Sequence, residues 1–159
     1  MLQYILEQVI VPILIGVLSS VVFLLLLSRV RTSFEISSEI AKFRSKKPGH
    51  EFGYEVKILN NSRRSAVEVK VRFAVVRNPK VPGGFIMPSR DFTLEKDSQL
   101  EIPGFRKNNP GASAFRFLTY DNLEEVWGEH DYIIFVLFAK DSLTGFGRVF
   151  TNNTFAKIG

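Results

Sequence analysis

Residues 67–75 have the sequence Val-Glu-Val-Lys-Val-Arg-Phe-Ala-Val, in which a hydrophobic side chain stands at every second position. Successive side chains of a β-strand point to opposite faces, so this alternation predicts a strand with one face buried and one face in water. Residues 51–58 alternate in the same way. The turn-forming residues Asn60–Arg64 separate the two runs, and we expect an antiparallel hairpin joined there.

The rest of the chain beyond residue 31 has further segments with strand character. Residues 132–138 are apolar on both faces, which predicts a central strand, and Asp141–Gly145 has the composition of a hairpin loop. Asp121–Gly128 is expected to form a helical turn that buries its apolar side chains. Seven or eight strands at this spacing predict a mainly β fold, an immunoglobulin-like β-sandwich. The additional expected strands are Phe34–Ile40, Phe92–Leu94, Leu100–Ile102, Ala114–Thr119, Tyr132–Lys140 and Gly147–Phe155.

Residues 1–31 differ from this pattern. No residue between Glu7 and Arg29 is charged, and the segment is rich in Val, Ile and Leu. A helix of this length spans roughly 30 Å, the thickness of the hydrocarbon core of a bilayer. A cleavable signal peptide would begin with basic residues, which are absent before the apolar run, and a small soluble domain would not bury a helix that is apolar on all sides. We therefore expect a transmembrane anchor at residues 1–31 and one domain at residues 32–159.

The charges that flank the apolar segment predict its orientation. Arg29, Arg31 and the basic connector at residues 42–47 follow the segment, and basic residues stay on the cytoplasmic side. We expect a single-pass protein of the inner (cytoplasmic) membrane, with the N-terminus outside and the domain in the cytosol. The absence of cysteine fits a reducing compartment. The sequons Asn60-Asn61-Ser62 and Asn152-Asn153-Thr154 would matter only in the opposite topology.

Two small residues within the apolar segment suggest helix association. Gly16 and Ser20 are four positions apart, a spacing at which helix backbones can approach closely. One helix cannot line a pore, so any effect on membrane permeability requires an oligomer.

The polar residues do not predict an enzyme. The two histidines, His50 and His130, are far apart in sequence, no spacing resembles a metal site, and Gly83-Gly84 lacks the Lys and Ser/Thr of a phosphate loop. Glu129-His130-Asp131 is interpreted as a solvated loop. We expect no cofactor and no metal. A net charge of +5 suits an anionic surface or ligand but is too small to predict binding of duplex nucleic acid.

Two basic loops are the best candidates for ligand binding. Arginine matches phosphate oxygens through two parallel hydrogen bonds, asparagine can contact a base or a ribose, and Phe105 or Tyr120 can stack on a base. The alternative is that these are ordinary solvated turn residues. The basic connector at 42–47 is expected to contact anionic lipid headgroups. The candidate phosphate ligands are Arg63, Arg64, Arg106 and Lys107, with Asn108 as the candidate reader of base or sugar.

Two segments resemble the cytoplasmic domain of inward-rectifier potassium channels. One is Asp131–Gly145, where an apolar strand runs into an acidic turn that ends in Thr-Gly, and the other is Val56–Arg72, where an Asn-containing turn precedes a Val-Glu-Val-Lys-Val-Arg strand. The resemblance implies an immunoglobulin-like sandwich that assembles as a four-fold ring under a membrane. Because the chain has no Gly-Tyr-Gly filter and one apolar segment, potassium selectivity is not implied.

In plan and size the chain also resembles the small membrane effectors of bacterial antiviral systems, including the CRISPR-associated membrane protein that binds cyclic tetra-adenylate. That resemblance implies a symmetric anionic ligand bound by a ring of sandwiches, which favours the assembled state.

These observations lead to a first hypothesis: a membrane-anchored oligomeric sensor-effector, with a tetramer favoured. Its cytosolic sandwich binds an anionic nucleotide-type signal, a cyclic oligonucleotide of antiviral defence being one candidate, and its helices alter the membrane. Membrane lipid is a further expected partner. The alternatives are a single-pass scaffold whose sandwich recruits a protein partner and, in the opposite topology, an extracytoplasmic adhesion domain.

Overall fold

The computed structural model describes residues 6–29, 32–77, 88–128, 131–153 and 155. The chain divides into two compact units, residues 1–31 and residues 32–159. Three features considered in the sequence lie wholly or partly outside the described residues: the loop that holds Gly83-Gly84, the segment Glu129-His130-Asp131 and the second sequon.

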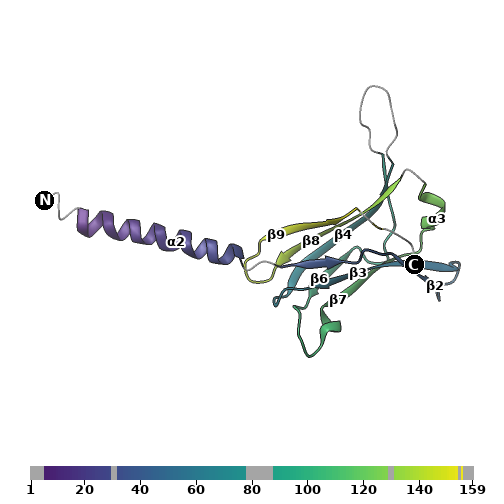
Figure 1. Cartoon of the computed structure of the whole chain (residues 1–159), viewed down its shortest axis with the longest axis horizontal. Coiled ribbons are helices and arrows are strands. Elements are labelled where there is room, and N and C mark those ends of the chain that lie inside the picture. The colour runs from purple at the N-terminus through teal and green to yellow at the C-terminus, as the bar shows by residue number, and fades with distance from the viewer. Residues whose placement is uncertain (1–5, 30–31, 78–87, 129–130, 154, 156–159) are drawn as a thin grey trace, which may run out of the picture. The chain divides into compact units, whose positions relative to one another are not determined.

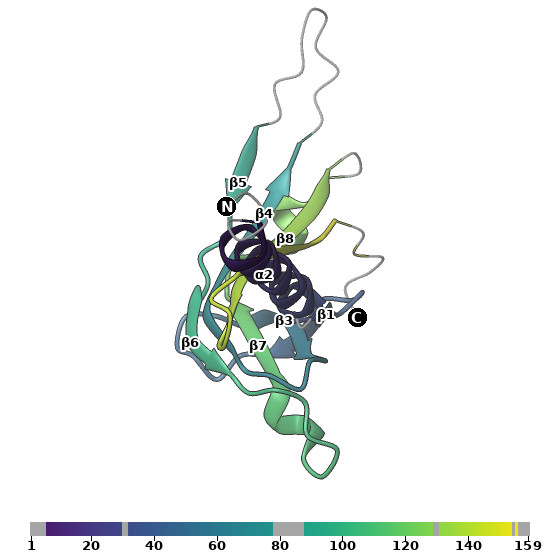
Figure 2. The same cartoon turned by 90° about the vertical axis from the view of Figure 1, so that its left-hand side faces the viewer.

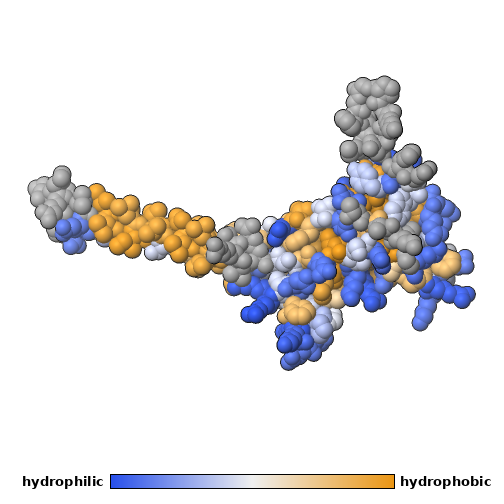
Figure 3. Space-filling model, in the orientation of Figure 1, coloured by the Kyte–Doolittle hydropathy of each residue, from blue (hydrophilic) through white to orange (hydrophobic). Residues whose placement is uncertain are grey.

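The first unit is a helix. A π-helical turn, η1 (Leu6–Ile10), leads into α2 (Val11–Arg29). Pro12 follows η1 directly at the start of α2, where its missing N–H leaves the preceding helical turn one hydrogen bond short. Most of the described side chains of α2 are apolar and exposed, and Figure 3 shows an almost continuous hydrophobic surface along the helix. By length and composition, Glu7–Leu27 can cross a membrane.

The second unit contains two antiparallel sheets (Figure 1). The first sheet is built around β3 (Phe52–Asn60), which pairs along one side with β7 (Ala114–Thr119). Two short strands share its other side: β1 (Phe34–Ile36) pairs with residues 58–60, and β2 (Ala41–Arg44) pairs with residues 52–55. The strands β1 and β2 therefore lie at opposite ends of β3.

The second sheet is built around β4 (Ala66–Val76) and β8 (Tyr132–Asp141), which pair with each other. The strand β8 pairs on its other side with β9 (Gly147–Asn152), so β8 is central, as predicted. The far side of β4 pairs with β5 (Ser89–Asp91) and β6 (Ser98–Ile102). Figure 2 shows β3 beside β7 and β4 beside β8.

The prediction of a hairpin between the two alternating runs is wrong. The strands β3 and β4 belong to different sheets, so the connection at residues 61–65 crosses from one sheet to the other. The resulting order, β1/β2–β3–β7 against β5/β6–β4–β8–β9, matches immunoglobulin strands A-B-E against C′-C-F-G. The predicted mainly β, immunoglobulin-like sandwich preceded by one helix is confirmed, and so is the hairpin between β8 and β9.

Several strand boundaries differ from the prediction. Residues 37–40 interrupt the expected strand Phe34–Ile40, because Ser37 forms a local turn in which its hydroxyl bonds the backbone of Glu39. Residues 92–94 follow β5 instead of forming a strand, and β9 ends at Asn152. Within β4, Glu68 has a φ of 50° and the pairing with β8 shifts, which marks a β-bulge. The bulge puts Ala66 in the core and leaves Val67 half-buried, against the predicted alternation.

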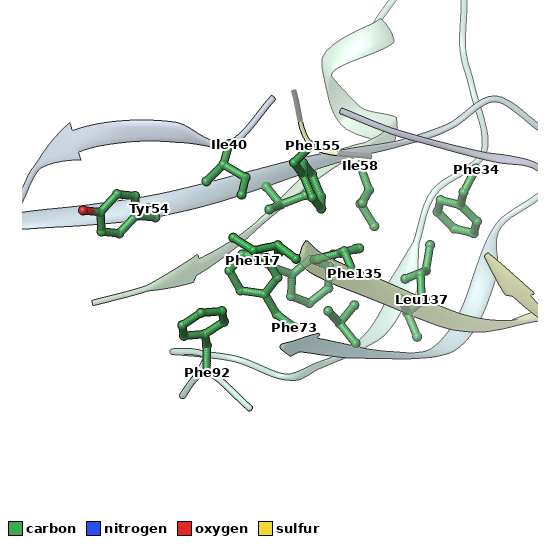
Figure 4. Close-up of a cluster of buried hydrophobic side chains, with 14 of the residues drawn as sticks. Phe34, Ile40, Tyr54, Ile58, Phe73, Phe92, Phe117, Phe135, Leu137 and Phe155 are labelled. Atoms are coloured by element: carbon green, nitrogen blue, oxygen red, sulfur yellow. The ribbon is translucent and has the colours of Figure 1, made fainter. Parts of the chain in front are cut away.

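The core lies between the two sheets and is rich in phenylalanine (Figure 4). The ring of Phe135 on β8 lies 5.9 Å from that of Phe73 on β4 and 6.0 Å from that of Phe117 on β7. These three side chains join both sheets. A short helix, α3 (Leu123–Val126), lies within the predicted helical turn and buries Leu123 completely.

Candidate functional site

Three connections meet at one end of the sandwich, and two of them carry the residues predicted to bind phosphate. The backbone N–H of Phe105 donates to the carbonyl of Ser62 at 2.7 Å, and that of Ser142 donates to the carbonyl of Ser65 at 3.2 Å. We call this surface the loop end; it comprises residues 61–65, 103–113 and 142–146. In immunoglobulin folds the corresponding B–C and F–G connections lie at the end that carries the antigen-binding loops of variable domains.

Asn60, the last residue of β3, holds the first two connections together. Its side chain is completely buried, and Nδ2 donates to the carbonyls of Arg64 (2.8 Å), Ile102 (3.3 Å) and Pro103 (3.2 Å). Its Oδ1 accepts from the backbone N–H and the hydroxyl of Ser62. One buried amide thus satisfies three carbonyls from segments about forty residues apart in the chain.

Gly104 allows the two connections to approach this closely. A Cβ atom at this position would lie 2.4 Å from the carbonyl oxygen of Arg63, closer than real Cβ contacts allow. The neighbour is backbone, which cannot swing away as a flexible side chain would. The two basic loops are therefore in contact through their main chains.

Arg64 has a partner within the domain. Its Nη1 lies 3.7 Å from Oδ1 of Asp141, whose side chain is 3 % exposed, while that of Arg64 is 32 % exposed. Asp141 Oδ1 also accepts hydrogen bonds from the backbone N–H groups of Leu143 and Thr144 and from the Thr144 hydroxyl. Arg64 thus balances the charge of a carboxylate that shapes the β8–β9 turn, and its role as a phosphate ligand stays a prediction.

The other predicted residues are open to a ligand. Arg63, Arg106, Lys107 and Asn108 are all exposed. Within the described part of the chain, none of the three cations forms an ion pair with a carboxylate. The loop end therefore presents three uncompensated positive charges.

Exposed hydrophobic side chains accompany these cations. Sequence reasoning named Phe105 but missed Leu143 and Phe146 as site residues. Phe105 is 39 % exposed, Leu143 is 66 % exposed and Phe146 is 52 % exposed. Leu143 and Phe146 lie in or beside the β8–β9 turn. Backbone groups of this turn form hydrogen bonds with Asp141, and both side chains point outward. The signal available in the sequence was a Leu and a Phe within a turn that otherwise has polar and small residues.

A second, hollowed surface lies near the opposite end of β3, around β2 and residues 120–124. Lys42, the lysine that lines this hollow, already has partners, because its Nζ lies 2.7 Å from Glu124 Oε1 and 4.4 Å from the centre of the Phe52 ring. The hydrogen bond that Lys42 donates to Glu124 raises the pKa of Lys42, and burial raises the pKa of the Tyr54 hydroxyl. This surface is therefore less suited to an anion than the loop end. Its lining includes Lys42, His50, Phe52, Tyr54, Tyr120 and Glu124.

The basic connector at residues 42–47 belongs to this second surface. Arg44 pairs with Phe52 at one end of β3, whereas Phe34, two residues after Thr32, pairs with Asn60 at the other end. Closeness in sequence to the anchor therefore does not place the connector near the first residues of the sandwich. Among the described residues, no group of three His, Asp or Glu side chains is arranged to hold a metal.

The residues predicted to mediate helix association lie on one side of α2. The hydroxyl of Ser20 donates to the carbonyl of Gly16 at 2.8 Å, so its polar group is satisfied within the helix. A Cβ atom at Gly16 would meet nothing within 4 Å, which leaves a flat patch where another helix can approach. Helix association through this patch stays a prediction.

Comparison with known proteins does not identify a family for this chain. No family model matches the chain, and no curated protein matches it. Among solved structures, the chain is similar to the X-ray structure of Northeast Structural Genomics Consortium target SoR45. The TM-score is 0.33 and the sequence identity is 12 %, over 78 % of this chain and 87 % of that chain.

Proposed function

We propose that this chain is a single-pass membrane protein whose sandwich binds a phosphate-bearing anion at the loop end. The observation that carries the proposal is the junction at Asn60, which brings two basic loops together. It leaves Arg63, Arg106 and Lys107 exposed, with no ion pair to a carboxylate in the described part of the chain. Catalysis plays no part in the proposal.

The cations at the loop end suit a phosphate group. Arg63 and Arg106 each offer a planar fork of N–H donors that matches two phosphate oxygens, and Lys107 adds a point charge. Asn108 follows directly and can bond a sugar or base. Among soluble ligands, a nucleotide-type signal is the class to test first, since the plan of the chain resembles that of nucleotide-binding membrane effectors.

The proposed topology places the sandwich in the cytosol. The support is the charge distribution, because Arg29 and Arg31 follow the apolar helix and basic flanks remain cytoplasmic. In this topology a ligand that holds several sandwiches together would stabilise an oligomer, with a tetramer favoured, and so change how the helices pack in the membrane.

Calorimetry on the full chain in detergent tests ligand binding. The probes are cyclic tetra-adenylate, smaller cyclic dinucleotides and inorganic pyrophosphate. We expect the triple variant R63A/R106A/K107A to bind at least about tenfold more weakly than the wild type, because charged contacts at open sites contribute about 0.5–1 kcal/mol each. The matched control is K46A/K57A/K96A, which removes three exposed lysines outside the loop end. Equal loss in both variants would mean that net charge, not the loop end, determines binding.

Helix association is tested separately. Gly16→Leu fills the flat patch on α2, so we expect it to lower the fraction of cross-linked oligomer of the full chain in detergent. Val17→Leu, at the neighbouring position on another side of the helix, is the control and should not change that fraction. If the fraction of cross-linked oligomer is unchanged in Gly16→Leu, any assembly must depend on the sandwich.

A protein-recruiting scaffold remains the second candidate, and one observation favours it. On the outer face of the second sheet, Val149 of β9 is 58 % exposed beside Phe138 of β8, which is half-buried. This apolar strip would suit a protein partner better than an anion. Val149→Asp should then abolish recruitment of that partner without changing anion binding.

A further inference from the structure

The loop end combines cations with exposed hydrophobic side chains, of which the aliphatic Leu143 is required neither for binding phosphate nor for stacking on a base. Arg63, Arg106 and Lys107 supply positive charge, whereas Phe105, Leu143 and Phe146 supply exposed hydrophobic surface. Segments that lie in the interface of a membrane combine basic residues with Phe and Leu, because the cations meet headgroup phosphates while the apolar groups enter the acyl boundary.

The sandwich begins at this same end. Thr32 is 2 % exposed, and the carbonyl of Ser33 accepts a hydrogen bond from the N–H of Asn61 at 2.8 Å. In the sequence, two residues separate Thr32 from Arg29, the last residue of α2. Three consecutive Cα–Cα steps cover at most about 11 Å. Within three residues of a helix that can span a bilayer, the chain therefore enters the sandwich at the end where the exposed cations and hydrophobic side chains lie.

We propose that the phosphates bound by the loop end are those of anionic lipid headgroups. Arg63, Arg106 and Lys107 contact the phosphates, and Leu143 and Phe146 enter the interface. This inference rests on the proposed function, whose phosphate-binding residues it keeps, and it names a membrane surface as the source of the phosphate.

The opposite end of the sandwich serves as an internal control. Its lysine Lys42 is paired with Glu124, whereas the other basic residues of the connector 42–47 are exposed. The two ends therefore differ in position and not in the presence of cations, because β2 pairs with the end of β3 opposite to the one where the sandwich begins. Glu51, in the turn between β2 and β3, is exposed. A probe at that turn should not respond to lipid charge.

The absence of cysteine makes a site-specific probe simple. The full-length variants L143C and E51C are labelled with an environment-sensitive NBD fluorophore and reconstituted into two kinds of vesicle. One is phosphatidylcholine alone, and the other is phosphatidylcholine and phosphatidylglycerol in equal parts. We expect the emission of the Leu143→Cys probe to shift to the blue and to be quenched by brominated acyl chains in the mixed vesicles only. The Glu51→Cys probe should not change.

Two further arms link the response to charge. Charge reversal in R63E/R106E/K107E, made in the L143C background, should abolish the shift, and high salt should reduce it. An equal emission of the Leu143→Cys probe in both vesicles, or an equal shift at Glu51→Cys, would overturn the inference.

Pyrophosphate distinguishes failure of this inference from failure of the proposed function. If pyrophosphate binds the wild type but not R63A/R106A/K107A while lipid charge has no effect on the probe, the lipid inference is wrong and the proposed function stands. If the substitutions change neither the binding of pyrophosphate or cyclic nucleotide nor the response of the probe to anionic lipid, both the lipid inference and the proposed function are wrong.

Discussion

Asn60→Ala is expected to destabilise the sandwich by roughly 2–4 kcal/mol, because three carbonyls lose a common donor and buried polar groups that lose a partner are costly, although the carbonyl of Arg64 also accepts from the Ser62 hydroxyl. The carbonyls belong to Arg64, Ile102 and Pro103. Chemical denaturation of residues 32–159, which form a compact unit with their own core, measures the loss.

Asn61→Ala is the matched control. Asn61 is adjacent and exposed, and the bond of its side chain among the described residues is to the exposed carboxylate of Glu35. We expect a change below about 0.5 kcal/mol, as is usual for surface substitutions. If Asn60→Ala were no more damaging than Asn61→Ala, the two basic loops would be held together by something other than this amide. Anion binding should fall with Asn60→Ala as well, because the cations would no longer be held at a common surface.

The fold was largely predictable because it depends on local periodicity. Residues 67–75 alternate so regularly that their strand was evident, and the apolar run at 132–138 identified the central strand. Pairing was less predictable, because a turn rich in Asn and Ser suits both a hairpin and a crossover between sheets. The crossover is accompanied by contacts of Asn60 with residues about forty positions away, which no local pattern contains. The bulge at Glu68 also depends on its partner strands.

The candidate site was predictable in part for the same reason. Composition located the two basic loops, but their contact through Gly104 and the carbonyl of Arg63 is a long-range feature of the backbone. Sequence also could not separate Arg63 from Arg64. The two are adjacent and chemically identical, yet only Arg64 reaches Asp141.

That difference leads to the second large effect. Arg64→Ala should destabilise residues 32–159 by about 3 kcal/mol, because removal of one partner leaves the buried Asp141 carboxylate without its counter-charge. Arg63→Ala removes an exposed side chain with no ion pair among the described residues and should change stability by less than about 0.5 kcal/mol. Denaturant unfolding of both variants gives the comparison directly.

A double-mutant cycle with Asp141→Asn isolates the coupling between the two side chains. Asparagine keeps an acceptor for the N–H groups of Leu143 and Thr144 but removes the charge, so Arg64→Ala should cost much less in that background. Equal costs in both backgrounds would contradict an ionic role for Arg64. The cycle also decides how binding data are interpreted, because a double variant at Arg63 and Arg64 would lose affinity through destabilisation of the β8–β9 turn. Arg63, Arg106 and Lys107 are therefore the substitutions that report on the ligand itself.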